Sequence, residues 1–518
     1  MEFTSQTNRP LILIGVLQSE EKMSFSAHVP FSMHDLSGEI KLRGEPGQQY
    51  DVSILRSKPA IIQPMIRLGI RYQEEDAQAL ANQWKEHDLH IQTVRTGENI
   101  RISESEYLDN REYWILASGF DSLEEAENTR RELPDFGSYQ AVLIHEVSAS
   151  GKILIEGNEF EQGVRLVPAE KSEFSFKLNN VRVGIGFHWD HRESQDLEGI
   201  LEFRIDKKGL LTAVNVLDIE RYLASVNSSE MVPDCSPEFL KAQTIAARCT
   251  VFATAGKHHY GEPFDLCADD HCQCFHGAGA IQKKSMQAAL ETRGQVLVHD
   301  GRVCDTRYAK ICAGVGESYQ NVWDNRYVEY LDKFHDSTNA STVHQTLENE
   351  EKLHTFIDST PKVFCNPKAY PVPEYLNYAH DYFRWNVEYL PDELGEIVAR
   401  KLGRDLGAIR DIIPQKRGFS GRMIYARIVG DLGESVVGKE LEIRRVLSKS
   451  HLYSACFYVE KEVAASGKTE KLILRGGGWG HGVGICQVGA AVMAEEGFTC
   501  EKILNHYYKS TELKKIYD

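Results

Sequence analysis

The sequence predicts an α+β protein made of three units. Residues 1–64 carry short apolar runs broken by glycine, proline and charged residues, which is typical of a small β-rich unit. Residues 65–150 combine strand patterns with helical periodicity, so we expect a small α/β unit. Residues 151–518 begin with alternating strands and continue into a helical sector, which indicates a larger mixed α+β domain. A polar, irregular stretch near residues 330–400 is interpreted as an insertion in that domain.

Length and charge limit the possible functions. A chain of 518 residues exceeds the size of a single hydrophobic core, in agreement with several units. The 59 lysines and arginines against 76 acidic residues give a formal charge of −17, which argues against a nucleic-acid partner. No apolar run reaches the roughly 18 residues of a transmembrane segment. The N-terminal segment lacks the basic region of a signal peptide, so Leu11 to Leu17 is predicted to be a buried strand.

The α/β unit contains two strand–helix patterns. IRLGIRY predicts a strand that precedes the helical pattern EEDAQALANQWKEH. Further on, Tyr113 to Ala117 predicts a strand, Ser122 occupies an N-cap position, and Leu123 to Leu133 has helical spacing with acids in its first turn. This second pattern resembles half of a SPOR-like module, a family that binds bare peptidoglycan glycan. An ordinary βα unit without a binding role is the alternative.

Two helices are predicted at the start of the helical sector. Residues 219–231 have helical spacing, and Pro233 ends the pattern. The second helix begins with Ser236 as N-cap and Pro237 at its first position, and it repeats apolar or small residues on one face up to Gly256.

Three separated blocks of the sequence resemble the SpoIID/LytB family, and together they span roughly residues 200–515. The blocks are YLASVNSSEMVPDCSPEFLKAQTIAARCTVFA, then ICAGVGESYQNVW, and last GGGWGHGVGICQVGAAVMAEEGFTCEKILNHYYKSTEL. The sequence departs from the family pattern at Ala313, where a second glycine is usual, at Gly316, where threonine is common, and at Cys486, where serine is common. These departures fall on packing positions more than on the expected catalytic acid.

Glu230 is the residue on which the resemblance places catalysis, as the acid/base carboxylate of a lytic transglycosylase. It ends a predicted helix, where the macrodipole disfavours a carboxylate, and Met231 and Val232 would add desolvation, so we expect a raised pKa. A protonated carboxyl can donate to a glycosidic oxygen and later take a proton back. One carboxylate suffices because the 6-hydroxyl of muramic acid is the nucleophile and a 1,6-anhydro product forms. The alternative is an exposed glutamate at a fraying helix end.

Further positions match the family blocks or lie in or near the glycine-rich segment GGGWGHGVG, residues 476–484, and we expect them to bind substrate. Trp479 suits stacking on a sugar, His481 could bond substrate or assist proton transfer, and Gln487 could bond loop backbone. Burial in the core or ion pairs on the surface are the alternatives for these side chains. The glycine segment lacks the lysine of a phosphate loop, and we expect no nucleotide or organic cofactor. The candidate substrate-binding residues are Lys241, Gln243, Arg248, Trp479, His481 and Gln487.

The segment KHHYGEPFDLCADDHCQCFHG has the composition of a zinc site. Cys267, His271 and Cys272 follow the spacing C-x-x-x-H-C, and His258 or His259 could supply the fourth ligand. We expect His258 with these three, and some SpoIID/LytB members carry a comparable zinc-binding set. Four protein ligands leave no open position, so the zinc would be structural. A disulfide between the two cysteines, or free thiols, are the alternatives.

The function predicted is therefore cleavage of peptidoglycan glycan strands by a lytic transglycosylase. A non-catalytic, LytB-like enhancer that binds glycan and stimulates a cell-wall amidase is the alternative. A hydrolase that uses metal-activated water is less favoured, since it requires an open zinc position. The resemblance implies a cell-envelope location, although no signal peptide is visible in the sequence.

Overall fold

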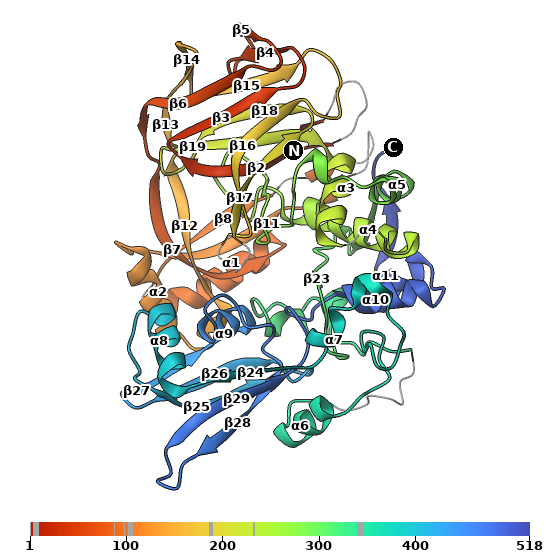
Figure 1. Cartoon of the computed structure of the whole chain (residues 1–518). Helices are drawn as coiled ribbons and strands as arrows, with labels where there is room; N and C mark the ends of the chain where they lie inside the picture. The colour runs from red at the N-terminus through yellow and green to blue at the C-terminus, as the bar shows by residue number, and fades with distance from the viewer. Residues whose placement is uncertain are drawn as a thin grey trace.

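The computed structural model describes residues 2–3, 10–87, 89–97, 99–101, 107–185, 190–231, 234–338 and 346–518. Helices and several separate sheets confirm the predicted α+β class. Figure 1 shows a β-sandwich at the top, a helical sector beside and below it, and a second mixed unit at the bottom. Val232 and Pro233, which the sequence places next to Glu230, lie outside the described residues. Among the described helices, none is long and apolar enough to cross a membrane.

The β-sandwich consists of two mainly antiparallel sheets. The first contains, in spatial order, β1 (Glu2–Phe3), β2 (Pro10–Glu20), β19 (Leu211–Asp218), β18 (Ile200–Ile205), β15 (Gly163–Pro168), β4 (Phe31–His34) and β5 (Ile40–Gly44). The second contains β14 (Asn158–Glu161), β13 (Ser150–Ile155), β6 (Gln49–Lys58), β3 (Lys22–Ala27), β16 (Phe176–Val183) and β17 (His191–Leu197). The sheets meet through aromatic pairs such as Phe25 with Phe203, whose ring centroids are 5.4 Å apart.

The sandwich differs from the separate unit expected over residues 1–64. The predicted strand at Leu11 to Leu17 is confirmed, but it lies in β2, which pairs with β19. In the same way β3 pairs with β16. Each sheet therefore combines strands from before and after the boundary expected at residue 64. Apolar alternation identifies a strand but not its partner, because partners are selected by burial over the whole sheet.

The α/β unit is inserted between two neighbouring strands of the sandwich, β6 and β13. Its sheet has the order β12 (Gln140–Val147), β7 (Ile61–Arg71), β11 (Glu112–Ser118) and β8 (His90–Thr96), with α1 (Glu74–Trp84) and α2 (Leu123–Glu132) packed on it. β9 (Asn99–Arg101) pairs antiparallel with β10 (Tyr107–Asp109). The predicted N-cap of α2 is confirmed, since the Ser122 hydroxyl accepts from the backbone N–H of Glu125 at 3.1 Å.

The helical sector begins directly after β19. It contains α3 (Ile219–Glu230), α4 (Pro237–Thr254), α5 (Lys283–Glu291), α10 (Gln487–Glu495) and α11 (Cys500–Tyr507), and strands β20 (Leu266–Cys267), β21 (Gln295–His299), β22 (Arg302–Val303), β23 (Tyr308–Ala309), β30 (Ile485–Cys486) and β31 (Glu512–Lys515). The predicted starts of α3 and α4 are confirmed, although Ser236 makes no side-chain capping bond. Because β31 pairs with β21, the end of the chain returns to this sector.

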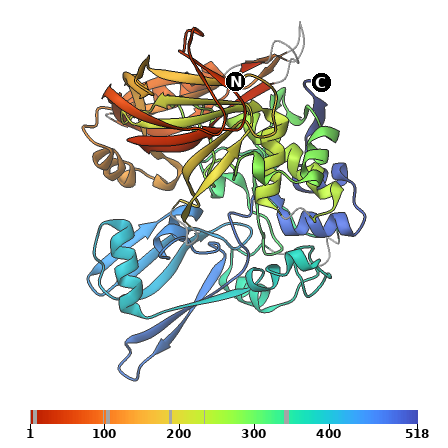
Figure 2. The same cartoon turned by 45° about the horizontal axis from the view of Figure 1, so that its top comes forward.

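The lower unit has its own hydrophobic core. It contains β24 (Trp385–Tyr389), β29 (Thr469–Gly476) and β28 (Phe457–Val463) in one sheet, β25 (Ile409–Arg417), β26 (Met423–Gly430) and β27 (Gly433–Val437) in another, and helices α8 (Pro391–Leu402) and α9 (Glu440–Val446). Figure 2 shows it facing the sandwich across the middle of the molecule. The segment before it is irregular, with short helices α6 (Glu350–Asp358) and α7 (Ala379–Tyr382). The polar stretch expected near 330–400 therefore covers only the approach to this unit and its beginning.

Candidate active site

A cleft of about 1650 Å³ lies between the α/β unit, the helical sector and the glycine-rich segment. Acidic, basic and aromatic side chains from all three line it, a mixture suited to a polar ligand with sugar faces. Its lining includes Trp114, Glu230, Asp270, Tyr308, Lys310, Trp323, Trp479, His481 and Gln487. The cleft thus brings together residues that are far apart in the sequence.

Glu230 is held at one wall of this cleft. It is the last residue of α3, and its side chain is 13% exposed. The backbone N–H of Cys274 donates to Oε1 at 3.4 Å, and Lys310 Nζ lies 3.6 Å from Oε2. The same ammonium also donates to the main-chain carbonyl of Glu230. These contacts fix the carboxylate while leaving part of it open to the cleft.

Three residues near Glu230 were not predicted from the sequence to lie beside it. Lys310 lies one residue before the second family block and shows no motif of its own. Burial raises the pKa of Asp270, and the charge of Glu230 adds to the rise. Burial also raises the pKa of Tyr308 well above its usual range, so its hydroxyl stays protonated and donates to Gln273 Oε1 at 3.0 Å. The site therefore has more donors and acids than sequence spacing predicts.

The predicted zinc segment forms a compact cluster beside Glu230. One ligand atom from each of His259, Cys267, His271 and Cys272 lies within 4.8 Å of all the others. His259 Nε2 is 3.3 Å from Cys272 Sγ, whereas His258 Nδ1 is 4.0 Å away. The expected fourth ligand, His258, is therefore replaced by His259, because β20 and the following turn bring the thiols to the side of His259.

The chemistry of this cluster fits zinc. Two thiols and two imidazoles are donors that Zn²⁺ binds in tetrahedral structural sites. Cys267 is anchored by the parallel pairing of β20 with β2, where Leu266 is opposite Ile14. The backbone N–H of Cys272 donates to the carbonyl of Asp269 at 3.0 Å, which fixes the turn between the two cysteines. The four residues could hold the ion with small side-chain adjustments.

Trp479 and His481 belong to the glycine-rich part of the cleft lining. Trp479 packs on Tyr382 at a centroid distance of 4.4 Å, and its backbone exchanges hydrogen bonds with Ile311. His481 Nδ1 accepts from the Val483 N–H at 3.1 Å, so the proton of the neutral ring is on Nε2. Burial lowers the pKa of His481 to about 3. His481 can therefore donate a hydrogen bond near neutral pH, but the expected role in proton transfer is not supported.

Gln487 has an unused donor in the same wall. It is the first residue of α10, is 1% exposed and lines the cleft. Its Nε2 has no hydrogen-bond partner among the described residues, so the expected bond to loop backbone is not made through this atom. A buried amide without a partner is costly, which makes a ligand acceptor at this position favourable.

Comparison with known proteins identifies the family. Residues 207–299, which contain α3, α4, Glu230 and the Cys/His cluster, match the family model described as Stage II sporulation protein, SpoIID. Stage II sporulation protein D of Bacillus amyloliquefaciens is 23% identical over 318 residues, covering 58% of this chain and 76% of that protein. The Amidase enhancer of Bacillus subtilis is 24% identical over 294 residues, covering 56% and 40% of the two chains. The SpoIID family domain at residues 207–299 and these relatives support the SpoIID/LytB family.

Two further matches cover other parts of the chain. Residues 317–484, which include the lower unit, match a domain of unknown function, DUF8618. An uncharacterised protein of Brachyspira hyodysenteriae is 26% identical over 354 residues, covering 66% of this chain and 80% of that protein. Family membership supports a cell-wall-related function.

Three expected substrate-binding residues of this SpoIID/LytB protein lie on α4, outside the cleft lining. Arg248 is fully buried and pairs with Glu220 at 2.5 Å, so it is a structural ion pair in the core. Lys241 pairs with Glu238 and Glu291 at 3.1 and 2.8 Å. Gln243 is also fully buried. The three face the protein interior or neighbouring helices because α4 is enclosed by the rest of the sector.

The glutamate of the second family block also has a structural position. Glu317 is fully buried and accepts from the Ser420 hydroxyl at 2.7 Å and the Asn321 amide at 2.8 Å. It therefore joins the SpoIID core to the loop between β25 and β26. Its neighbourhood was not predictable from the block itself.

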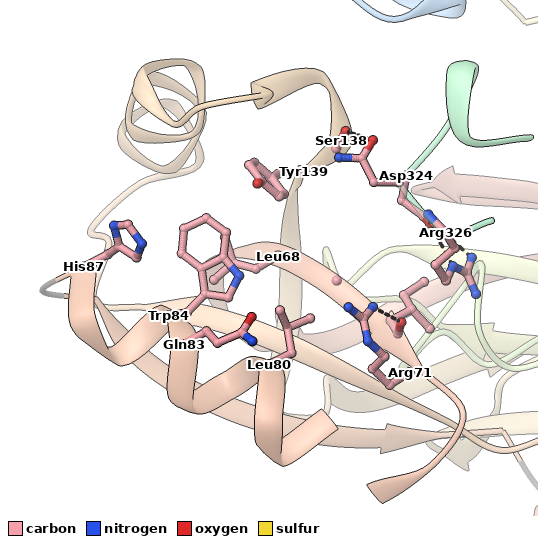
Figure 3. Close-up of a pocket in the computed structure, with 13 residues that line it drawn as sticks. Leu68, Arg71, Leu80, Gln83, Trp84, His87, Ser138, Tyr139, Asp324 and Arg326 are labelled. Atoms are coloured by element: carbon pink, nitrogen blue, oxygen red, sulfur yellow. Dashed lines mark hydrogen bonds and ion pairs between the residues drawn. The ribbon is translucent and has the colours of Figure 1, made fainter. Parts of the chain in front are cut away.

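The α/β unit is fixed to the SpoIID core near a smaller pocket of about 340 Å³. Figure 3 shows Trp84 and Tyr139 on one side of this pocket and Asp324 with Arg326 on the other. Ser138 donates to Asn325 Oδ1 at 2.6 Å beside it. These contacts explain how the unit can contribute residues to the large cleft.

Proposed function

We propose that this protein is a peptidoglycan lytic transglycosylase in which Glu230 is first the general acid and then the general base. The observation that supports it best is the position of Glu230: a partly buried carboxylate that accepts a hydrogen bond from the Cys274 N–H and forms an ion pair with Lys310, at the wall of a large aromatic-lined cleft. Glycan strands of peptidoglycan are the substrate class, as expected for the family. A carboxylate at such a wall can reach a bound glycosidic oxygen.

The reaction balances with a single carboxyl group. Protonated Glu230 gives its proton to the glycosidic oxygen as the bond between that oxygen and C1 of muramic acid breaks. The 6-hydroxyl of the same sugar then forms a bond to C1, and its proton passes to the Glu230 carboxylate. No water is consumed, and the products are a new free 4-hydroxyl end and a 1,6-anhydro-muramic end.

Neighbouring residues would position the carboxyl and the glycan. Lys310 contacts both the side chain and the main chain of Glu230, which restricts rotation of the carboxyl. In the glycine-rich part of the cleft, Trp479 offers an aromatic face and Gln487 offers an N–H donor to sugar hydroxyl or acetamido groups, while His481 lines the same part of the cleft. The substrate would therefore be held between two walls with the scissile bond at Glu230.

A structural zinc ion at His259, Cys267, His271 and Cys272 belongs to the same proposal. These residues would hold the ion through two thiolates and two imidazoles. All four positions are filled by protein, so the ion would fix the loop and not activate water. The loop includes Cys274, whose backbone N–H is bonded to Glu230. Zinc would thus stabilise the position of the acid.

An amidase enhancer without turnover is the second candidate. The observation that favours it is the similarity to the Amidase enhancer of Bacillus subtilis, of which this chain covers 40%. In that case the cleft would bind glycan strands, and a cell-wall amidase would be the partner.

Mass spectrometry of digested glycan strands distinguishes the two candidates. Strands with and without stem peptides are incubated with the full-length wild type, with Glu230→Gln and with Glu291→Gln, a matched control at an ion-paired glutamate on α5. We expect anhydro-muramic ends from the wild type and from Glu291→Gln, and a rate about 10²- to 10⁴-fold lower for Glu230→Gln. Glycan binding without products from any of them would favour the enhancer.

A further inference from the structure

A second cluster of metal-binding side chains lies behind the glycine-rich wall. It contains Cys312, Asp336, Cys365 and Cys486, with one ligand atom of each within 4.8 Å of all the others. None of the four is more than 1% exposed. They come from the second family block, from two points of the irregular segment, and from the residue just before α10. Neither the family blocks nor the Cys/His segment accounts for this convergence.

The spacing of the sulfurs matches a shared tetrahedral ion. Cys312 Sγ and Cys365 Sγ are 3.7 Å apart. Two thiolates bound to one tetrahedral Zn²⁺, each at about 2.3 Å, are separated by about 3.8 Å. Cys312 and Cys365 are therefore spaced as two ligands of one ion would be. Ligand atoms of Cys486 and Asp336 lie close enough to both sulfurs to supply the other two ligands.

Backbone donors point at the sulfurs. The N–H of Cys312 donates to Cys486 Sγ at 3.3 Å, and the N–H of Gly314 donates to Cys312 Sγ at 3.4 Å. The second bond needs the intervening Ala313 in the left-handed region, at a φ of 70°. Cys486 is also the N-cap residue of α10, where the helix dipole favours negative charge. These features stabilise thiolates, the form that binds metal.

Asp336 is the fourth donor, and its carboxylate oxygens accept hydrogen bonds from neutral groups. Its Oδ1 accepts from the Tyr507 hydroxyl at 2.7 Å, and its Oδ2 accepts from the Cys365 N–H at 2.9 Å. In the described part of the chain, no lysine or arginine pairs with it, and His506 Nε2 is 4.0 Å away. Buried carboxylates are normally paired or bound to a metal. A Cβ at residue 489 would lie 2.6 Å from Asp336 Oδ1, so a glycine at this position leaves room for the Asp336 carboxylate.

We propose that Cys312, Asp336, Cys365 and Cys486 form a second, structural Zn²⁺ site. Three soft thiolates with one carboxylate, closed by protein on all sides, suit Zn²⁺ better than Mg²⁺ or Ca²⁺. Binding releases one proton from each thiol that is protonated beforehand, and the full set leaves the site with a net charge of about −2. Two guanidinium groups lie close enough to offset it, since the buried Arg422 donates to the Cys312 carbonyl at 3.3 Å and the partly buried Arg384 donates to the Ala313 carbonyl at 3.3 Å.

This site would fix the glycine-rich wall of the cleft. Cys486 lies on β30, which pairs with β23, and its Sγ contacts the carbonyl of Lys310 at 3.9 Å. The glycine-rich segment with Trp479 and His481 leads directly into Cys486. Loss of the ion would therefore loosen both the sugar-facing wall and the residue that holds Glu230.

Zinc content of the full-length protein tests the proposal. We expect two zinc ions per chain in the wild type, purified with reductant, and one each in Cys365→Ser and in Cys267→Ser/Cys272→Ser, because the clusters are separate. Cys456→Ser is the matched control, since Cys456 is equally buried but bonds only to the Ser420 carbonyl, and it should keep both ions. A wild type with one zinc that is retained in Cys365→Ser overturns the proposal.

Cobalt substitution and X-ray absorption provide tests that do not depend on one variant folding. Co²⁺ added to Cys267→Ser/Cys272→Ser should give thiolate charge-transfer absorption and tetrahedral d–d bands. In the wild type, X-ray absorption at the zinc edge should show an average of more than two sulfurs per zinc. An average of two or fewer, or a Cys312–Cys365 disulfide detected as the loss of two hydrogens in mass, contradicts the second site.

Discussion

The two walls of the cleft are built in different ways. The helical wall carries Glu230 on a regular helix and is supported by residues close in sequence, including the Cys/His cluster within residues 259–272. The glycine-rich wall carries Trp479 and His481 on irregular backbone, and the cluster behind it joins four distant segments, from Cys312 to Cys486. The proposed catalytic acid thus lies at the end of a regular helix, while the residues proposed to contact sugar lie on irregular backbone next to the proposed second zinc site.

The two walls differ in the source of their stability. Regular helices satisfy their own backbone and add side-chain packing, so the helical wall needs few special contacts. A glycine-rich segment loses more conformational entropy on folding and offers little side-chain surface to pack. The proposed second zinc site would compensate for this in the glycine-rich wall.

Breaking the buried ion pair behind the helical wall should have the largest effect on stability. Arg248→Met leaves the carboxylate of Glu220 buried with only hydroxyl and backbone partners, so we expect a loss of about 3 to 5 kcal/mol in the free energy of unfolding. Lys241→Met, which removes partly exposed ion pairs on the same helix, should cost less than about 1 kcal/mol. Urea denaturation measures both. Equal costs, or loss of glycan binding in folded Arg248→Met, would support the substrate-contact role expected from sequence.

Removing the Cys/His cluster should weaken the helical wall by a smaller amount. Cys272→Ser is expected to lose one zinc ion and about 3 kcal/mol of stability, which corresponds to zinc present at a few hundred times its dissociation constant. Turnover should fall too, because the loop that bonds Glu230 through the Cys274 N–H loosens. Elemental analysis and thermal denaturation check the change, with Cys500→Ser, outside both clusters, as control. Unchanged zinc content would contradict the site.

Truncating the aromatic face should affect the glycine-rich wall without affecting proton transfer. Trp479→Ala is expected to weaken glycan binding about 10-fold, or about 1.4 kcal/mol, with little change in kcat. Trp479→Phe keeps an aromatic face and should retain most of the affinity. Isothermal titration with stem-free strands and kcat measurements separate the two effects. A large fall in kcat with unchanged affinity would place Trp479 in the chemical step instead.

Acid should destabilise the glycine-rich wall through His481, with the smallest expected effect. The folded pKa is lowered to about 3 from an ordinary value of 6.5, so the unfolded chain binds a proton that the folded chain does not. Stability from this group is complete above pH 6.5 and falls as pH decreases from there towards 3. At pH 5.5 the loss should be about 1 kcal/mol. In His481→Gln, the free energy of unfolding should differ less between pH 7.5 and pH 5.5 than it does in the wild type. The same difference in both proteins would count against this role of His481.

Several local features were predictable from the sequence. The N-cap of α2 at Ser122 and the start of α4 at Pro237 follow from chemistry within one helical turn. The Cys/His spacing predicted a cluster because its members fall in one short segment. The choice of His259 over His258 could not be predicted, since adjacent residues differ only in the direction that the fold gives them.

The α+β class, the helices around Glu230, the family resemblance and the segment that carries the first cluster were predictable from the sequence alone. These depend on periodicity, capping and motifs, which act over a few residues. The folded structure was needed to show that β1 to β6 complete one sandwich with β13 to β19, that Arg248 is buried, and that Lys310 contacts Glu230. It also brought Cys312 and Cys486 together with Asp336 and Cys365. Such contacts join distant segments whose proximity is set by packing of the whole core, and no local pattern encodes it.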